Sequence, residues 1–356
     1  MIHSAVLTKL LKIKYPIIQA PMFGVSSPEM VAAAAKAECL GSLPLGDLPA
    51  EKCVDLIRAT RRLTTKDFAV NIFVNEIPQL SDELKVKYEE AKRFIEQFAE
   101  YQKLDVELPD INEIKLTTYQ EQLDAIISEG CNILSFTFGN LDGVSIQRLK
   151  SHGVTLMGTC TSVKEALILE QSGIDLICVQ GIEAGGHRGT FASDEIPKIG
   201  GLSLLAQVYD SVKAPLIYAG GIYNGRTLIA AKALGAEGCQ IGSLLLSSVE
   251  SALNRFEKDR LAVIKENDTV LTKSFSGRYA RGIKNAFIEK MEQSGYILPY
   301  PYQNKLTNLL RATAKAKENI DFVSIWAGQS TRELSEESTT FILNNLIESV
   351  EPIVRG

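Results

Sequence analysis

Short apolar runs alternate with longer amphipathic segments along the first two thirds of the chain. Each run spans four to seven residues and is rich in Ile, Leu, Val or Phe, which is typical of a strand buried on both faces of a parallel sheet. Eight runs predict strands, the second of them the weakest: 16–20, 40–43, 68–73, 132–138, 154–157, 175–180, 215–219 and 238–241. The intervening segments have the spacing of amphipathic helices: 29–37, 49–60, 118–129, 143–151, 163–172, 202–211 and 225–234.

Helix start signals agree with this division. Ser27 offers a capping hydroxyl and Pro28 takes the first helical position, so a helix is predicted to begin there. Thr161 or Ser162 caps the helix predicted at 163–172. Residues 79–115 are charged and have a helical period before an acidic, proline-containing stretch, which predicts an inserted helical segment rather than a regular strand–helix unit.

Repeated strand–helix units require a parallel sheet. Eight of them in about 240 residues match a closed (β/α)8 barrel, the TIM barrel, of the α/β class. An open doubly wound sheet uses the same units and remains the alternative, although no G-x-G-x-x-G follows the first strand. We therefore predict a barrel over 1–250, with the helical insertion near 79–115. Residues 251–356 are predicted to supply the last barrel helix and an appended helical region packed on the barrel.

Composition narrows the function classes. The chain is 45% hydrophobic and 23% charged with a net charge of −5, which is ordinary for a globular protein and argues against a nucleic-acid partner. No segment is long and apolar enough to span a bilayer and no cleavable leader is evident, so we expect a cytoplasmic protein, monomeric or homodimeric. The six cysteines form no C-x-x-C pair and no two histidines have metal-ligand spacing, which predicts reduced core thiols and no metal.

The segment 181–189 carries the strongest chemical signal. It reads Gly-Ile-Glu-Ala-Gly-Gly-His-Arg-Gly and follows the predicted strand 175–180 directly. Glycines let the backbone approach a ligand closely, and an imidazole among them can act as a base or donor over a bound molecule. We predict that His187 is catalytic. Glu183 and Arg188 either pair with each other or bond to nearby backbone.

Two neighbouring strand ends predict a phosphate site. The seventh strand ends in Gly220-Gly221 and the eighth in Gln240-Ile241-Gly242-Ser243. In barrels these two ends commonly bind phosphate through backbone N–H groups and a helix N-terminus, and Ser243 adds a hydroxyl. The segment 274–282, with two arginines around glycine, either helps to hold a phosphate or anchors the C-terminal region; we favour the anchor.

Other strand ends carry groups that suit a ring with mixed donors and acceptors. Asn71 and Gln180 both donate and accept, as the pyrimidine edge of a flavin requires, and Met22 follows the first strand. Each of these side chains has a plainer alternative, because an amide can satisfy local backbone groups and a methionine can fill a core gap. Ser135 and Thr137 are expected to bond within the barrel.

The chain resembles the nitronate monooxygenase (2-nitropropane dioxygenase) family over nearly its whole length. The resemblance is carried by the following segments: 18–22, 70–73, 135–139, 180–189, 219–222, 238–243, 276–278, 301–304 and 326–329. It implies an FMN-dependent barrel that oxidises alkyl nitronates with O2 to carbonyl compounds and nitrite. It further implies that His187 is the base or nitronate-binding group and that FMN is bound by Asn71, Gln180, Gly185, Gly220 and 240–243. Ser243 stands where threonine is usual, and the hydroxyl is kept.

Two other functions stay open at this stage. A flavin-dependent enoyl-acyl-carrier-protein reductase has a similar Glu-Ala-Gly-Gly-His loop, although the segment Trp326–Gln329 favours the nitronate enzymes. A non-catalytic flavin-binding barrel is the third possibility, and the retained His187 argues against it.

Overall fold

The computed structural model describes residues 4–193, 195–331 and 334–355. Its eight parallel strands are hydrogen-bonded in the order β1-β9-β8-β6-β5-β4-β3-β2. A parallel bridge between Ile18 and Leu40 joins the two ends, with the Gln19 N–H donating to the Leu40 carbonyl at 2.8 Å. The sheet is therefore a closed (β/α)8 barrel, and the open-sheet alternative is wrong. The barrel strands are β1 (Ile17–Gln19), β2 (Ser42–Gly46), β3 (Ala69–Phe73), β4 (Ile133–Thr137), β5 (Thr155–Cys160), β6 (Leu176–Gln180), β8 (Leu216–Ala219) and β9 (Gly238–Ile241).

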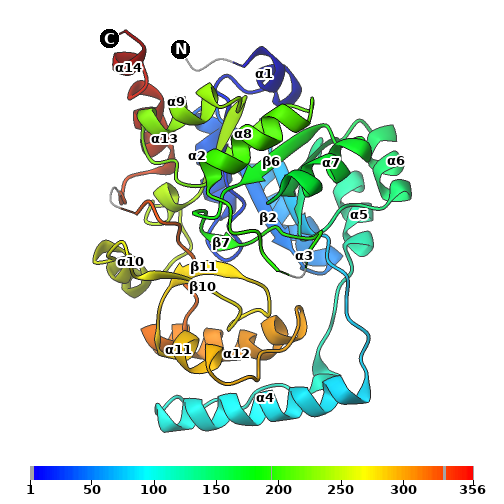
Figure 1. The fold of residues 1–356 in the computed structure, drawn as a ribbon, viewed down its shortest axis with the longest axis vertical. Coiled ribbons are helices and arrows are strands. Elements are labelled where there is room, and N and C mark those ends of the chain that lie inside the picture. Colours follow the sequence, from blue (N-terminus) through cyan, green and yellow to red (C-terminus); the bar gives the residue numbers. More distant parts are fainter. Residues whose placement is uncertain (1–3, 194, 332–333, 356) are drawn as a thin grey trace.

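Eight helices surround the strands (Figure 1). They begin where the sequence carries caps: the Ser27 hydroxyl accepts from the Met30 N–H, with Pro28 in the first turn. For the helix predicted at 163–172, the cap is Ser162 and not Thr161, because the Ser162 hydroxyl accepts from the Glu165 N–H. The barrel helices are α2 (Pro28–Lys36), α3 (Ala50–Leu63), α5 (Tyr119–Ser128), α6 (Gly143–Ser151), α7 (Val163–Gln171), α8 (Gly201–Ser211), α9 (Gly225–Ala233) and α13 (Thr339–Glu348).

Two strands differ in extent from the sequence-based prediction. β2 continues through Pro44 to Gly46, because a register shift between these residues lets the strand pass a proline that cannot donate to the ladder. β5 extends past Gly158, which ends the apolar run in the sequence. A Cβ at Gly158 would lie 2.6 Å from the Leu169 side chain, so the glycine lets α7 pack closely against the strand.

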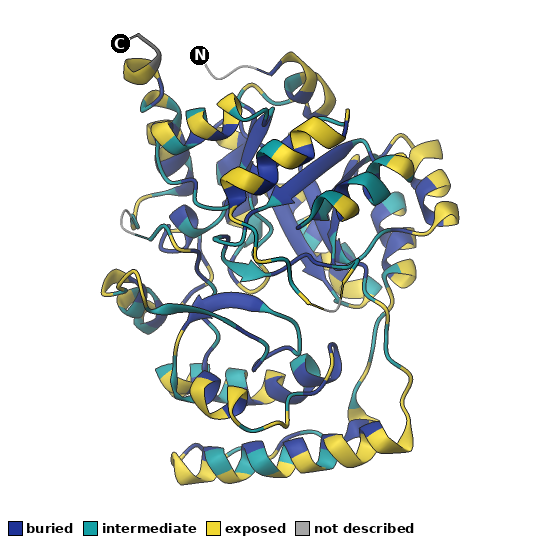
Figure 2. Cartoon of the chain, in the orientation of Figure 1, coloured by how far each residue is buried: buried dark blue, intermediate teal, exposed yellow. Residues whose placement is uncertain are grey.

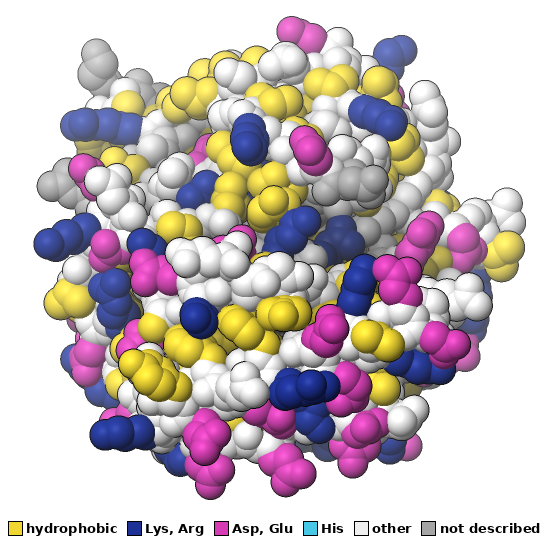
Figure 3. Space-filling model, turned by 60° about the horizontal axis from the view of Figure 1, so that its bottom comes forward, with side chains coloured by type: hydrophobic (Ala, Val, Ile, Leu, Met, Phe, Trp, Pro, Cys, Tyr) yellow, Lys and Arg dark blue, Asp and Glu magenta, His cyan; other side chains and the backbone are white. Residues whose placement is uncertain are grey.

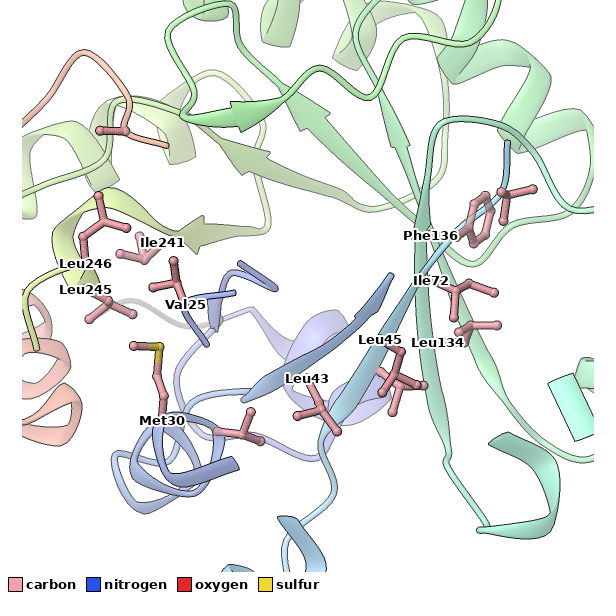
Figure 4. Packing of buried hydrophobic residues seen from close by; sticks show 14 of the residues in the cluster. Val25, Met30, Leu43, Leu45, Ile72, Leu134, Phe136, Ile241, Leu245 and Leu246 are labelled. Carbon is pink, nitrogen blue, oxygen red and sulfur yellow. The ribbon is translucent and has the colours of Figure 1, made fainter. Parts of the chain in front are cut away.

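The apolar side chains form two layers. Inside the barrel, Leu7 and Leu11 of α1 (Ala5–Leu11) pack with Ile18 and Met157 and close the end at which the strands begin. Outside it, strand side chains meet the helices; Ile72, Leu134 and Phe136 come together from neighbouring strands (Figure 4). The barrel strands are mostly buried, with partly buried positions near their ends, whereas the barrel helices expose one face (Figure 2).

A second body of structure faces the open end of the barrel, and we call it the cap lobe (α4 with residues 251–329). It contains α4 (Asp82–Tyr101), α10 (Arg255–Ala262), β10 (Thr269–Thr272), β11 (Ala280–Ile283), α11 (Ala286–Glu292) and α12 (Tyr302–Ala316). The insertion α4 lies beneath α11 and α12 (Figure 1), where Phe94 stacks on Tyr296 and Phe98 on Phe322. The chain then returns to the barrel, and α13 packs against α2 and α9 as the eighth barrel helix.

The cap lobe is largely helical, but it also contains strands that the sequence analysis of 251–356 did not predict. β10 and β11 form an antiparallel hairpin, and β11 also pairs with β7 (Gly186–His187). Each strand of the hairpin has only four residues, and β7 has two, so their pairing depends on a distant segment rather than on local periodicity. The missed hairpin matters because it holds the histidine loop.

The surface carries mixed charge. Acidic and basic side chains are interspersed over the face shown in Figure 3. All six cysteines are buried and free, as expected. Within the described residues, no helix combines the length and apolar character needed to cross a membrane.

Candidate active site

A cavity of about 1010 Å³ lies between the carboxyl ends of the barrel strands and the cap lobe. Barrels place their sites at this end, and the volume suits a cofactor with a small substrate. Nearly all the predicted site residues line it: Met22, Asn71, Gln180, Gly185, His187, Gly220, Gly221, Gln240, Gly242 and Ser243. Ile241 does not line the cavity. Its side chain is fully buried in the outer apolar layer, and its carbonyl accepts from the Ala20 N–H at 2.8 Å.

One end of the cavity is made of glycine backbone. Gly220 and Gly221 have φ of 130° and 68°, a region that favours glycine. A Cβ added at Gly242 would reach 3.5 Å from the Ala20 Cβ and 3.6 Å from the Met22 sulfur, so a larger side chain there would narrow the cavity beside Met22. Ser243 opens a short 3₁₀ turn, and its hydroxyl oxygen accepts from the Gly328 N–H at 2.8 Å. That bond leaves the hydroxyl hydrogen available to donate to a ligand.

The two amide side chains that line the cavity already have protein partners. The Asn71 amide donates to the Ser135 hydroxyl at 2.8 Å, as expected for a serine that bonds within the barrel. The Gln180 amide donates to the His187 carbonyl at 2.8 Å and accepts from the Gly189 N–H at 2.9 Å. Gln180 therefore holds the histidine loop, which is the plainer of the two roles its sequence position allowed, while its side chain still lines the cavity.

The hydrogen bonds around Ser276 favour one tautomer of His187. Its Nε2 lies 2.8 Å from the Ser276 hydroxyl oxygen, and that hydroxyl donates to the Arg278 carbonyl at 3.0 Å. Because a hydroxyl has one hydrogen, Ser276 accepts from His187, and the neutral ring carries its hydrogen on Nε2. Nδ1 is then the unprotonated nitrogen. The segment 274–282 thus does more than anchor the C-terminal region, since it also orients the imidazole.

The imidazole is held neutral. Burial, reinforced by the positive charges of Arg278 and Arg311, lowers the pKa of His187 to about 3. A neutral ring at physiological pH can accept a proton, and it adds no charge to the cavity.

Two buried arginines hold the loop that precedes His187. Arg188 donates to the carbonyls of Gln180 and Gly181, and Arg281 donates through two nitrogens to the Ile182 carbonyl. Glu183 accepts from the Tyr218 hydroxyl and from the Gly201 N–H instead of bonding to Arg188. Glu183 and Arg188 therefore do not pair with each other. Each bonds to neighbouring groups, which is the second of the two sequence-based alternatives.

Sequence reasoning did not single out an aromatic wall around His187. The ring centroid of Phe138 lies 5.5 Å from that of His187, and the ring centroid of Trp326 lies 5.3 Å from that of His187. Phe138 also meets Phe73 at 4.6 Å and Tyr300 at 5.4 Å. The Tyr300 hydroxyl is buried without a hydrogen-bond partner among the described residues. These rings come from β3, the residue after β4 and two cap segments. Phe73, Phe138 and Trp326 lie in the family-like segments 70–73, 135–139 and 326–329, whereas Tyr300 stands just before 301–304.

Comparisons with known proteins agree with this geometry. The family model described as nitronate monooxygenase matches residues 4–350. A Staphylococcus saprophyticus protein named probable nitronate monooxygenase is 38% identical over 357 residues, covering 99% of both chains. Proteins of that name from Staphylococcus aureus are 38% identical over 98% of both chains. Nitroalkane oxidase from Streptomyces ansochromogenes has a TM-score of 0.88 at 32% identity over 99% of both chains. FabK from Thermotoga maritima has a TM-score of 0.75 at 25% identity, covering 98% of this chain and 96% of that one.

Proposed function

Because this chain belongs to the nitronate monooxygenase family, we propose that it binds FMN and oxidises alkyl nitronates, such as propionate 3-nitronate, with O2. The products are a carbonyl compound and nitrite, so the reaction removes a toxic nitro compound. The observation that carries the proposal is a neutral, oriented imidazole in the same cavity as two glycine-rich strand ends.

The cavity suits a flavin mononucleotide along its length. Gly220, Gly221 and Gly242 offer backbone approach for a phosphate, and the Ser243 hydroxyl has its hydrogen free of the Gly328 contact. Asn71 and Gln180 line the same cavity with amide groups that suit the polar edge of the ring, and Gln180 pairs with Ala219, next to Gly220. Met22 adds an apolar surface beside Gly242. When bound, the flavin supplies the electron transfer between nitronate and O2 that no side chain provides.

The protein's own contribution centres on His187. A nitronate is already an anion without its α-proton, so the imidazole needs only to orient it beside the ring. With a neutral nitroalkane the unprotonated Nδ1 takes the α-proton, and the Nε2–H bond to Ser276 keeps that nitrogen in the accepting form. Trp326 and Tyr300 line the cavity from the cap lobe and exclude water from the reacting groups.

The test is an oxygen-electrode assay on the purified holoprotein with propionate 3-nitronate, combined with nitrite determination. We expect oxygen uptake and nitrite release, both lost in His187→Asn with flavin still bound. The His152→Asn variant is the matched control, since His152 is exposed and does not line the cavity.

Two results would contradict the proposal. Turnover of NADH with a crotonyl thioester, without nitronate oxidation, would assign the chain to enoyl reduction. Flavin binding with neither activity would make it a binding protein.

A further inference from the structure

Phe138 contacts His187 through its ring and carries the Arg278 guanidinium on that ring, and neither residue lines the cavity. We propose that Arg278, held over the Phe138 ring, is a positioning residue that opposes protonation of His187. This inference rests on the proposed role of His187, but it concerns the state of the imidazole and is testable without any turnover.

The backbone at Phe138 is strained. Its φ is 77°, the left-handed region that a bulky side chain rarely adopts, and it stands one residue beyond β4. Such strain persists where the surroundings enforce it, and it is found most often at functional sites. The side chain is 3% exposed and contacts His187, Tyr300 and Phe73 through its ring. The strained turn therefore places one ring at the centre of the aromatic wall.

Arg278 uses that ring as a platform. The centre of its guanidinium lies 4.3 Å from the Phe138 ring centroid, within the range of a cation–π interaction. One guanidinium nitrogen also donates to the Thr190 carbonyl, three residues beyond His187. The Ser276 hydroxyl donates its hydrogen to the Arg278 backbone carbonyl. The hydroxyl oxygen is then free to accept a hydrogen bond from His187. One turn thus supplies both the orienting hydroxyl and a fixed cation.

The charges around His187 are unbalanced. Burial is the main cause of the lowered pKa of the imidazole, and two cations reinforce it: Arg278, from the turn before β11, and Arg311, from α12. Tyr300 is the other titratable group on the aromatic wall, and burial raises its pKa far above the usual value, so it stays neutral. Of the two carboxylates near these cations, Glu165 bonds to Thr161 and backbone N–H groups, and Asp47 pairs with Lys305. No carboxylate bonds to His187 among the described hydrogen bonds, so the local field opposes its protonation.

The experiment measures the protonation of His187 directly. The chain has three histidines, so ¹⁵N-histidine resonances of the holoprotein are assignable by comparison with His187→Asn. Arg278→Gln removes the charge while retaining a donor for the Thr190 carbonyl, and Arg278→Lys keeps the charge. Arg281→Met is the matched control, because it deletes another buried arginine of the same segment that bonds to the Ile182 carbonyl.

We expect the His187 titration to move up by about one to two pH units in Arg278→Gln, since a neighbouring like charge shifts a pKa by that order. In Arg278→Lys the pKa of His187 should stay within a few tenths of a unit of the parent value. In Arg281→Met the pKa of His187 should not shift, although this variant also loses a buried arginine. The acidic limb of the kcat/KM profile with nitronate should move with the titration. An unchanged titration in a folded, flavin-loaded Arg278→Gln protein overturns the inference, as does an equal shift in Arg278→Lys. If the parent protein lacks nitronate turnover, the proposed function fails while the titration still decides the role of Arg278.

Discussion

The hydrogen bond between His187 and Ser276 makes a prediction that the structure allows to be worked through. Ser276→Ala removes the acceptor 2.8 Å from Nε2 and the donor that satisfies the Arg278 carbonyl at 3.0 Å. Ser276 itself is buried at 1% exposure, so water does not readily replace the lost hydroxyl. Both the tautomer of the imidazole and the stability of the cap turn should therefore respond.

The expected magnitudes follow from the two lost bonds. A hydrogen bond of ordinary net strength, about 1 kcal/mol, favours the Nε2–H tautomer by roughly five- to tenfold, and this preference disappears in Ser276→Ala. Leaving a buried N–H and a buried carbonyl unpaired costs about 1–3 kcal/mol of unfolding free energy. The kcat/KM for nitronate should fall by about twofold, because the fraction of the enzyme that presents the correct nitrogen drops from roughly nine tenths to about one half.

The assay combines ¹⁵N NMR of labelled histidine, which separates protonated from unprotonated ring nitrogens, with urea unfolding. Ser274→Ala is the matched control: its hydroxyl is also fully buried on this segment but bonds to Thr272 and Glu292 instead of His187. The control should lose stability without changing the His187 tautomer. A Ser276→Ala protein whose His187 keeps a single Nε2–H tautomer would refute the assignment of the orienting bond.

Three further predictions concern the loop and the cavity. In Gly185→Ala the new Cβ would lie 2.5 Å from the Gly328 backbone nitrogen, so urea unfolding should show a loss of about 1–3 kcal/mol and flavin binding should weaken. Gly186→Ala meets nothing within 4 Å and should cost only the roughly 1–2 kcal/mol of its left-handed φ. The pKa of His187 is depressed in the folded protein, so the unfolded chain binds a proton at higher pH than the folded protein does. The free energy of unfolding should therefore fall as pH decreases from about 6.5 toward 3, by up to about 1.4 kcal/mol per pH unit, and His187→Asn should flatten this part of the pH curve. Gly242→Val should weaken FMN binding at least about tenfold with little change in the urea midpoint. A curve for titration with FMN that equals that of the parent protein would show that Gly242 does not lie at the cofactor.

The sequence predicted the barrel well because the barrel depends on local signals. Buried parallel strands appear as apolar runs, and helix starts carry caps such as Ser27 and Pro28, so eight units were countable without any tertiary information. The glycines at the ends of the last two strands were found in the same way, and they line the cavity. The strand ends were misplaced where tertiary packing overrides the pattern, as at Gly158, whose close contact with Leu169 no local rule reveals.

The cap side of the site could not be predicted in this way. Ser276 lies 89 residues from His187 along the chain, and the two meet only because β11 pairs with a two-residue strand. Phe138 follows a predicted strand, but its role depends on Arg278 and Tyr300, which arrive from the cap lobe. For Gln180 the residue type suited a flavin, but its amide bonds within the histidine loop, which the sequence alone did not reveal.

The central claim is that the cavity binds FMN through its phosphate at the glycine strand ends. The most direct measurement is calorimetric titration of the flavin-free protein with FMN and, separately, with riboflavin, which lacks the phosphate. The account predicts one FMN per chain, with riboflavin bound at least about a hundredfold more weakly and Ser243→Ala reducing only the FMN affinity. Equal affinities for the two flavins, or no binding of either, would contradict it.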